Sequence, residues 1–260
     1  MGQKKNKPDP SPSVMSLGDH LEELRWRIIY ALAGLVIAII VCLIFCGHII
    51  SFIENPYIEV MGEENRLQTL APAEGIISYM NIALIAALVV SSPWVFYQLW
   101  MFVAAGLYPQ EKRYVYIAVP FSVSLFIAGA LFFIFFIAPV TLKFLVLFNK
   151  EIIGVASNFT FKNYISFITI MMLIFGLAFQ TPIVVFVLAK TSLVPLSAFY
   201  KFRKYVVLGI IVIASAVLPG SDPFSLFALS IPMYLLYELG ILISYISIKK
   251  KKSETNGQPR

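Results

Sequence analysis

Residues 28–53 contain no Asp, Glu, Lys or Arg, and this uninterrupted apolar stretch is the strongest constraint on the fold. A helix rises about 1.5 Å per residue, so about 20 apolar residues cross the roughly 30 Å hydrocarbon core of a membrane. Of the 260 residues, 59% are hydrophobic and 13% are charged. Soluble proteins are about 45–50% apolar and about 25% charged, and a chain of this size cannot bury the excess. We therefore expect an integral membrane protein, not a soluble enzyme.

Further apolar stretches follow the first along the whole chain, and together they predict an all-α, polytopic membrane protein with six transmembrane helices. Prolines inside these stretches remove helix hydrogen bonds, so we expect kinked helices that form a curved wall. The sequence divides into a cytoplasmic N-terminal segment (1–27), a membrane domain (28–248) and a basic cytoplasmic tail (249–260). The predicted spans are about 28–53, 76–105, 114–142, 163–189, 205–218 and 224–248.

The lysines and arginines predict the orientation of the chain. If the N-terminus lies inside, sixteen of the 20 Lys and Arg residues fall in cytoplasmic segments and four in outer segments. Positive charges concentrate on the cytoplasmic side of membrane proteins, so both termini are expected to be cytoplasmic. The basic clusters at the two ends suit anionic lipid headgroups, and the net charge of +6 therefore needs no nucleic acid as partner.

The sequence lacks the residue patterns of a metal site or a catalytic centre. Cys42 and Cys46 lie four residues apart in the first apolar stretch, and His20 and His48 have no second ligand nearby. No nucleophile–base pair is present, so we expect no enzymatic activity, no catalytic residue, no metal and no cofactor.

Polar residues inside the apolar stretches are the default functional candidates of a membrane protein. Gln180 and Glu238 are the two that lie deep in a predicted span. A secondary transporter of a small solute would need such groups, or broken helices, to meet at the middle of the membrane. This transporter is the alternative function that the sequence leaves open.

Acidic residues occur at the predicted cytoplasmic surface, where basic residues are usual. Glu23 precedes the first span, and Glu111 lies between the second and third. Judged by residue type alone, Asp19 and Glu22 are typical of a helix cap. By the same reasoning, Glu23 has two possible roles, to stabilise the start of a helix or to bind a ligand. Glu111 would be a solvated charge in a loop.

Several strings of residues, in order along the chain, resemble the TatC family, the receptor subunit of the Sec-independent (twin-arginine) protein translocase. The resemblance covers about residues 15–248. The strings that carry it are residues 20–25 (HLEELR), 97–111, 175–182 (FGLAFQTP), 222–225 (DPFS) and 231–238.

The resemblance implies a function: export of folded proteins across the bacterial cytoplasmic (inner) membrane, using the proton-motive force. The implied partners are twin-arginine signal peptides and small single-span subunits of the TatA and TatB type. Self-association is also expected.

The resemblance also implies roles for individual residues. Glu23 and Glu111 would meet the two arginines of a signal peptide, and Leu24, Arg25 and Phe102 would frame them. A guanidinium group binds a carboxylate through two parallel hydrogen bonds, which lysine cannot do, so a pair of acids can select arginine.

The remaining expected sites lie within the membrane or on its outer side. Gln180 and Glu238 are expected to be contacts with partner helices or polar groups within the membrane, and Glu238 is also open to the role of a paired structural acid. Gln180 stands where many family members have a glutamate. On the outer side, Pro56 is expected to stop the first helix, and Asp222 to shape a tight turn.

Overall fold

A computed structural model describes residues 17–62, 65–107, 112–155, 159–191, 193–217 and 223–256. Within these ranges every regular element is a helix, and a single parallel bridge joins Gln68 to Thr160. The expected all-α class is therefore confirmed. The elements are α1 (Leu17–Met61), α2 (Glu74–Ala105), α3 (Lys112–Phe132), the π-helix η1 (Phe133–Ile137), α4 (Ala138–Phe148), the π-helix η2 (Asn149–Ile153), α5 (Phe161–Ala178), α6 (Thr181–Lys190), α7 (Leu196–Val217) and α8 (Pro223–Asn256).

Five helical stretches of the described residues are long and apolar enough to cross a membrane. The helix α7 is not among them, because Lys201, Arg203 and Lys204 lie in its first half. Its uncharged part, residues 205–217, is only about 20 Å long at 1.5 Å per residue. The five stretches are residues 20–61, 74–105, 112–153, 161–190 and 226–249.

Large apolar side chains remain exposed along these helices. In α1, the exposed fraction is 64% for Ile37 and 73% for Ile44, and in α7 it is 59% for Leu208. Water would disfavour such surfaces, whereas lipid tails do not. The exposed side chains therefore agree with helices that are solvated by lipid.

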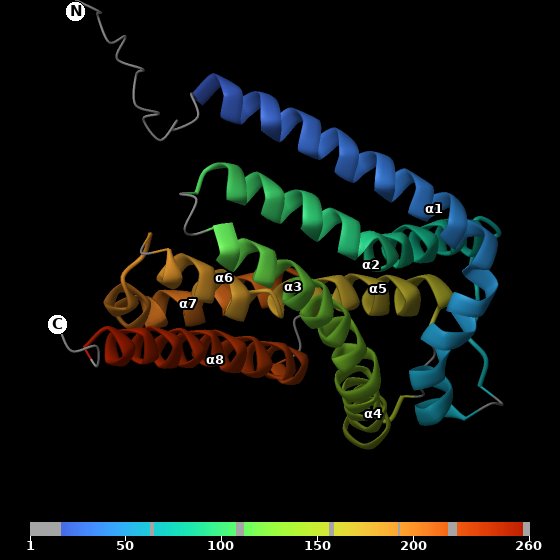
Figure 1. Cartoon of the computed structure of the whole chain (residues 1–260). Helices are drawn as coiled ribbons and strands as arrows, with labels where there is room; N and C mark the ends of the chain where they lie inside the picture. The colour runs from blue at the N-terminus through green and yellow to red at the C-terminus, as the bar shows by residue number, and fades with distance from the viewer. Residues whose placement is uncertain are drawn as a thin grey trace, which may run out of the picture.

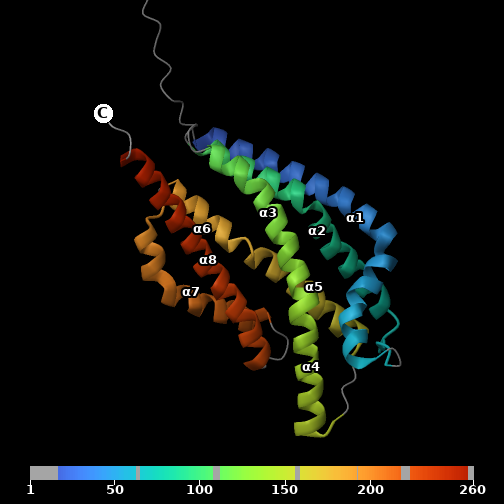
Figure 2. The same ribbon diagram turned by 60° about the horizontal axis from the view of Figure 1, so that its bottom comes forward.

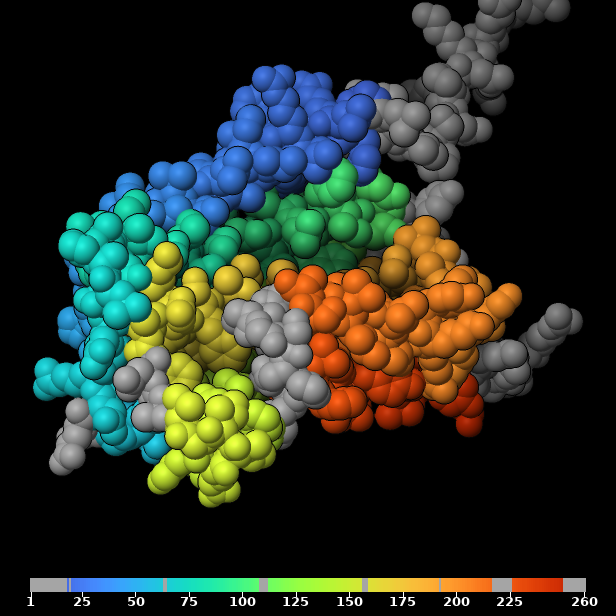
Figure 3. All heavy atoms as spheres, turned by 180° about the vertical axis from the view of Figure 1, so that it is seen from behind, coloured from blue at the N-terminus to red at the C-terminus, as the bar shows by residue number. Residues whose placement is uncertain are grey.

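The helices form a series across the molecule, with α1 beside α2, α5 in the middle, and α6, α8 and α7 beyond it (Figures 1 and 2). The start of α1 and the end of α8 lie at the same end, which we call the terminal side (Figure 1). The end of α2, the start of α3, the end of α6 and the start of α7 also lie on the terminal side (Figure 1). The other end is the opposite side, from which α4 protrudes (Figures 2 and 3).

Prolines act differently at different positions. Pro182 lies in the first turn of α6, where a missing N–H costs little, whereas Pro139 follows the π-helix η1 within one continuous helical stretch. The expectation that Pro56 stops the first helix is wrong, because α1 continues through Pro56 to Met61. Pro56 is itself buried, and the neighbouring carbonyl of Ile53 accepts a hydrogen bond of 2.7 Å from the Tyr164 hydroxyl of α5. Directly after the proline, the Tyr57 ring packs against the Tyr164 ring with centroids 5.3 Å apart, so contacts with α5 support α1 on both sides of Pro56.

Glycines bring two pairs of helices into close contact. A Cβ atom on Gly129 of α3 would lie 2.6 Å from the carbonyl oxygen of Phe175 in α5. A Cβ atom on Gly240 of α8 would lie 2.8 Å from the Cα atom of Pro182 in α6. Small residues permit this close backbone approach, which is typical of helix packing in membranes. The helix α6 is thereby fixed to α8.

Candidate functional site

Glu23 belongs to a short series of hydrogen-bonded side chains that connects α1 to α2 on the terminal side. Its Oε1 atom accepts a hydrogen bond of 3.1 Å from Nη2 of Arg27, one helical turn further along α1. The Nη1 atom of the same guanidinium donates to Oε1 of Gln98 in α2, also at 3.1 Å. Gln98 is only 3% exposed, so this bond satisfies a polar group that water cannot reach.

The carboxylate of Glu23 has capacity for another donor. Its second oxygen, Oε2, has no hydrogen-bond partner among the described residues, and about a quarter of the side chain (23%) is exposed. An ionised carboxylate offers about four lone-pair sites, of which Arg27 uses one. Glu23 can therefore accept one further donor, whereas a guanidinium that binds both carboxylate oxygens competes with Arg27 for Oε1.

The residues expected to frame Glu23 take different positions. Phe102 of α2 stacks on the His20 ring, with ring centroids 4.5 Å apart and planes 24° apart. Leu24 is half-buried, whereas Arg25 is exposed and has no ion pair within the described residues. The structure thus brings His20, Glu23 and Phe102 together at the α1–α2 contact. Glu111 lies outside the described residues, in the segment between α2 and Lys112, where α3 begins.

An apolar groove with a volume of about 330 Å³ opens beside this contact. Its walls come from the first turn of α1, the end of α2, the helix α6 and the segment after α6. Trp100 is 7% exposed and fixed in place, whereas Leu193 is 65% exposed at the rim. The lining residues are His20, Leu99, Trp100, Val103, Gly106, Leu107, Val184, Val187, Leu188 and Leu193.

Trp94 fixes the position of α1 relative to α2. Its Nε1 atom donates a hydrogen bond of 2.8 Å to the backbone oxygen of Tyr30. A Cβ atom on Gly34 would lie 2.3 Å from Cδ1 of the same ring, so only glycine allows the two helices to approach this closely. This packing holds Glu23 of α1 next to Gln98 and Phe102 of α2.

Gln180 lies at the break between α5 and α6, and its side chain reaches α3. The Nε2 atom donates a hydrogen bond of 3.0 Å to the backbone oxygen of Ser122. The hydroxyl of Ser122 accepts a hydrogen bond of 2.7 Å from Nε1 of Trp100 in the groove. Gln180 is therefore bonded within the protein, and this bond uses one of the two amide hydrogens of its side chain.

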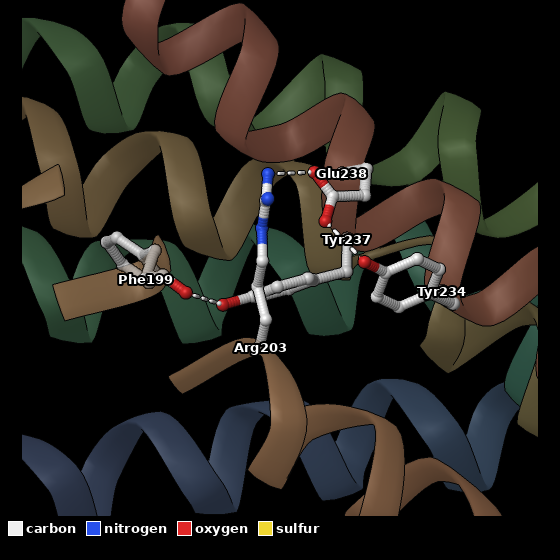
Figure 4. A network of polar contacts seen from close by, with 5 residues as sticks. All are labelled: Phe199, Arg203, Tyr234, Tyr237 and Glu238. Atoms are coloured by element: carbon white, nitrogen blue, oxygen red, sulfur yellow. Dashed lines mark hydrogen bonds and ion pairs between the residues drawn. The ribbon is translucent and has the colours of Figure 1, made fainter. Parts of the chain in front are cut away.

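Glu238 of α8 belongs to a polar network with α7 (Figure 4). Its Oε2 atom lies 2.6 Å from Nη2 of Arg203, and its Oε1 atom accepts a hydrogen bond of 2.7 Å from the Tyr234 hydroxyl. The neighbouring Tyr237 donates to the backbone oxygen of Phe199 at 2.8 Å. Glu238 therefore joins two helices and is not an isolated intramembrane acid.

Two further expectations concern the opposite side and metals. Asp222 lies outside the described residues, which resume at Pro223. In the part of the chain that the structure describes, no three His, Cys, Asp or Glu side chains are grouped so as to hold a metal ion.

Four residues that the sequence does not mark as site residues complete these networks: Arg27, Gln98, Ser122 and Arg203. A signal existed only for Arg27, which follows Glu23 by four residues and so shares its helix face. Gln98 and Ser122 are polar residues within apolar stretches, and only the packing of the helices shows what they bond.

A helical fold with five long apolar helices and a surface suited to lipid defines a polytopic membrane protein. The sequence model of the TatC family, described as Sec-independent protein translocase protein, matches residues 19–232. The chain belongs to the TatC family.

Individual relatives match nearly the whole chain. It is 32% identical over 240 residues to the Sec-independent protein translocase protein TatC of Helicobacter pylori, covering 92% of this chain and 93% of the relative. It is 32% identical over 238 residues to the TatC of Aquifex aeolicus, covering 92% and 98%. A crystal structure of the twin-arginine translocase receptor TatC superposes with a TM-score of 0.79 at 31% identity, covering 88% of this chain and 99% of that chain.

Proposed function

We propose that this chain is the signal-peptide receptor and core subunit of a twin-arginine translocase, which exports folded proteins across the bacterial inner membrane using the proton-motive force. One observation carries the proposal. In this member of the TatC family, the Glu23 carboxylate lies beside an apolar groove and has one oxygen without a hydrogen-bond partner among the described residues. Transport of protein, and not catalysis, is the activity of such a subunit.

The proposed topology has six spans, with the terminal side in the cytoplasm. The five long stretches and the shorter α7 supply the spans. The excess of Lys and Arg in the segments of the terminal side supports this orientation, and it supports anionic lipids as contacts of the basic clusters. The limits 1–27, 28–248 and 249–260 for the cytoplasmic and membrane parts belong to the same proposal.

In the proposed complex, one arginine of the signal peptide binds Glu23 and the other binds Glu111 from the α2–α3 connection. A lone exposed ion pair contributes only about 0–1 kcal/mol. Two pairs in a fixed register contribute more, particularly when the peptide also buries apolar surface. The groove beside His20 and Phe102 is apolar and open at its rim, and so it is suited to an apolar part of the same peptide.

The proposed protein partners are small single-span subunits of the TatA and TatB type and further copies of this chain. Gln180 and Glu238 are the expected contacts with partner helices. Both already have intramolecular bonds, and a partner would therefore add to or replace these bonds. The helix α7, which is paired with Glu238 through Arg203, carries exposed apolar side chains such as Leu208, which a single helix can cover.

A transporter of a small solute has less support. The α5–α6 break at Phe179 and Gln180 is the kind of interruption that transporters use, but Gln180 is bonded to α3, and Glu238 is paired with Arg203. Uptake of labelled solutes into vesicles that contain the purified protein would distinguish this class from the receptor.

Binding of a labelled twin-arginine signal peptide to the purified protein in detergent tests the proposal. A twin-lysine peptide is the ligand control, and Glu22→Ala, at an exposed neighbour of Glu23, is the protein control. We expect arginine-selective binding that is lost in Glu23→Ala and in Glu111→Ala and that weakens at higher salt. Equal binding of both peptides, or full binding by both variants, would refute the receptor function of these acids.

A further inference from the structure

Trp100 and Ser122 form a buried hydrogen bond behind the groove. Trp100 of α2 is 7% exposed and lines the groove, and Ser122 of α3 is fully buried. The indole Nε1 atom donates to Oγ of Ser122 at 2.7 Å. Among the described residues, the Trp100 N–H has no acceptor other than the Ser122 hydroxyl. This hydroxyl therefore fixes the orientation of the indole ring.

The same serine is bonded to the break between α5 and α6. Its backbone oxygen accepts the Nε2 hydrogen of Gln180 at 3.0 Å. At the break, the N–H groups of Ile183 and Val184 both donate to the carbonyl of Gln180, at 3.1 and 3.0 Å, and Pro182 has no N–H to offer. The backbone there has fewer regular helix bonds than in α5 or α6, and it can turn more easily.

The groove lies between α2 and α6. Trp100, Leu99 and Val103 of α2 form one wall, and Val184, Val187 and Leu188 of α6 form the other. A bulky side chain that occupies the groove presses on both walls, and so it acts on the position of α6 and on the orientation of Trp100. Movement of α6 would act on the break at Gln180, and rotation of Trp100 would act on Ser122.

We infer that Ser122 is a positioning residue that couples the groove to the α5–α6 break through Trp100 and Gln180. The inference rests on the proposed function in one respect, that a signal peptide occupies the groove. When the groove is filled, Trp100 and α6 separate, and the bonds that they share through Ser122 adjust together. The helix α8 takes part, because Gly240 packs on Pro182, and Lys190 of α6 donates to Oγ of Ser247 at 2.9 Å.

Fluorine NMR of protein labelled with 5-fluorotryptophan tests this coupling. The chain has three tryptophans, and single replacement by Phe assigns each signal. In the protein without peptide, we expect Gln180→Leu to shift or broaden the signal of Trp100. Thr169→Val is the matched control, because the Thr169 hydroxyl bonds to the Ile165 carbonyl within its own helix α5. This control should leave the Trp100 signal unchanged.

The Ser122→Ala background separates coupling from a direct effect. Without the hydroxyl, Trp100 is disconnected from Ser122, so adding Gln180→Leu should cause no further change in the Trp100 signal. A Trp100 signal that is the same in Gln180→Leu and the parent, or that moves equally with and without Ser122, would overturn the inference.

Addition of the twin-arginine peptide completes the test. We expect the peptide to shift the Trp100 signal, and Gln180→Leu to change peptide affinity by about fivefold, at the low end of usual coupling between sites. Thr169→Val should change neither the response of the Trp100 signal to the peptide nor the peptide affinity. If the peptide does not bind but Gln180→Leu still moves the Trp100 signal through Ser122, the coupling stands and the proposed function fails. If the peptide binds and Trp100 does not respond, the inference fails and the receptor function stands.

Discussion

The Nη2 atom of Arg27 lies 3.1 Å from Oε1 of Glu23, so the acid proposed to receive an arginine of the signal peptide already holds one from its own helix. The pair is partly exposed, with 24% of the Arg27 side chain and 23% of the Glu23 side chain accessible. Arg27 therefore competes with an incoming arginine for the same carboxylate, while its bond to Gln98 keeps α1 and α2 in register.

This competition predicts that Arg27→Gln binds a twin-arginine peptide more tightly than the parent does, by up to about fivefold. An exposed ion pair contributes about 0–1 kcal/mol, and about 1.4 kcal/mol corresponds to a factor of ten. Glutamine keeps a donor for Gln98 but removes the charge. Fluorescence anisotropy measures the change, and Lys201→Gln, at an exposed residue of α7 outside the site, is the control with the same charge change. Weaker binding by Arg27→Gln than by Lys201→Gln would show that Arg27 orients Glu23 and does not compete.

The close approach of α1 to Trp94 predicts a large cost for Gly34→Ala. The added Cβ atom would lie 2.3 Å from the indole Cδ1 atom, and overpacking typically costs about 1–3 kcal/mol. We expect a Tm in detergent lower by about 2–4 °C for each kcal/mol lost. Gly47→Ala, with open space around the same helix, should change the Tm little. In a Trp94→Leu background, Gly34→Ala should cost less, and an unchanged cost there would contradict this explanation.

The network between α7 and α8 predicts that single and double replacements differ. Glu238→Leu removes the carboxylate partner of the Arg203 guanidinium, whose Nε atom already has no hydrogen-bond partner among the described residues. We expect a loss of about 1 kcal/mol, less than for a fully buried pair because both side chains are partly exposed. The double variant Arg203→Met, Glu238→Leu should recover most of this loss in thermal unfolding. Additive losses would mean that the two side chains do not interact.

The proposed topology predicts opposite labelling of two exposed leucines. Leu70, 75% exposed, lies on the opposite side, and Leu193, 65% exposed, lies on the terminal side. A membrane-impermeant maleimide added to intact cells should label Leu70→Cys and not Leu193→Cys, and inverted vesicles should give the reverse. Cys42 and Cys46 are buried and should contribute little background. The same pattern in both preparations would contradict the topology.

Five of the helical stretches were predictable from the sequence because each is longer than a bilayer is thick, whereas the uncharged part of α7 is shorter. The continuation of α1 through Pro56 was not predictable, because Tyr164, which contacts Ile53 before the proline and Tyr57 after it, lies more than a hundred residues away. A proline stops a helix only where nothing else supports the next turn, and sequence patterns do not show such support.

The candidate site was predictable in part for a similar reason. Glu23 stands out as an acid at a basic surface, and its partner Arg27 is close along the same helix. Gln98 and Ser122 do not stand out, because their importance depends on which helix packs against them. The groove could not be predicted at all, since its two main walls come from residues that are more than eighty positions apart.

The division of the site between α1, α2 and α6 also bears on biosynthesis. Glu23, Arg27, Gln98, His20 and Phe102 all lie within the first two helices, and their contacts need no later residue. Chains are synthesised from the N-terminus, so these contacts of the candidate site can form as soon as the α1–α2 hairpin has entered the membrane. The apolar groove cannot form until α6 has been synthesised, about eighty residues later. A nascent chain would thus carry an acid exposed to arginines before it has a groove to hold the rest of a peptide.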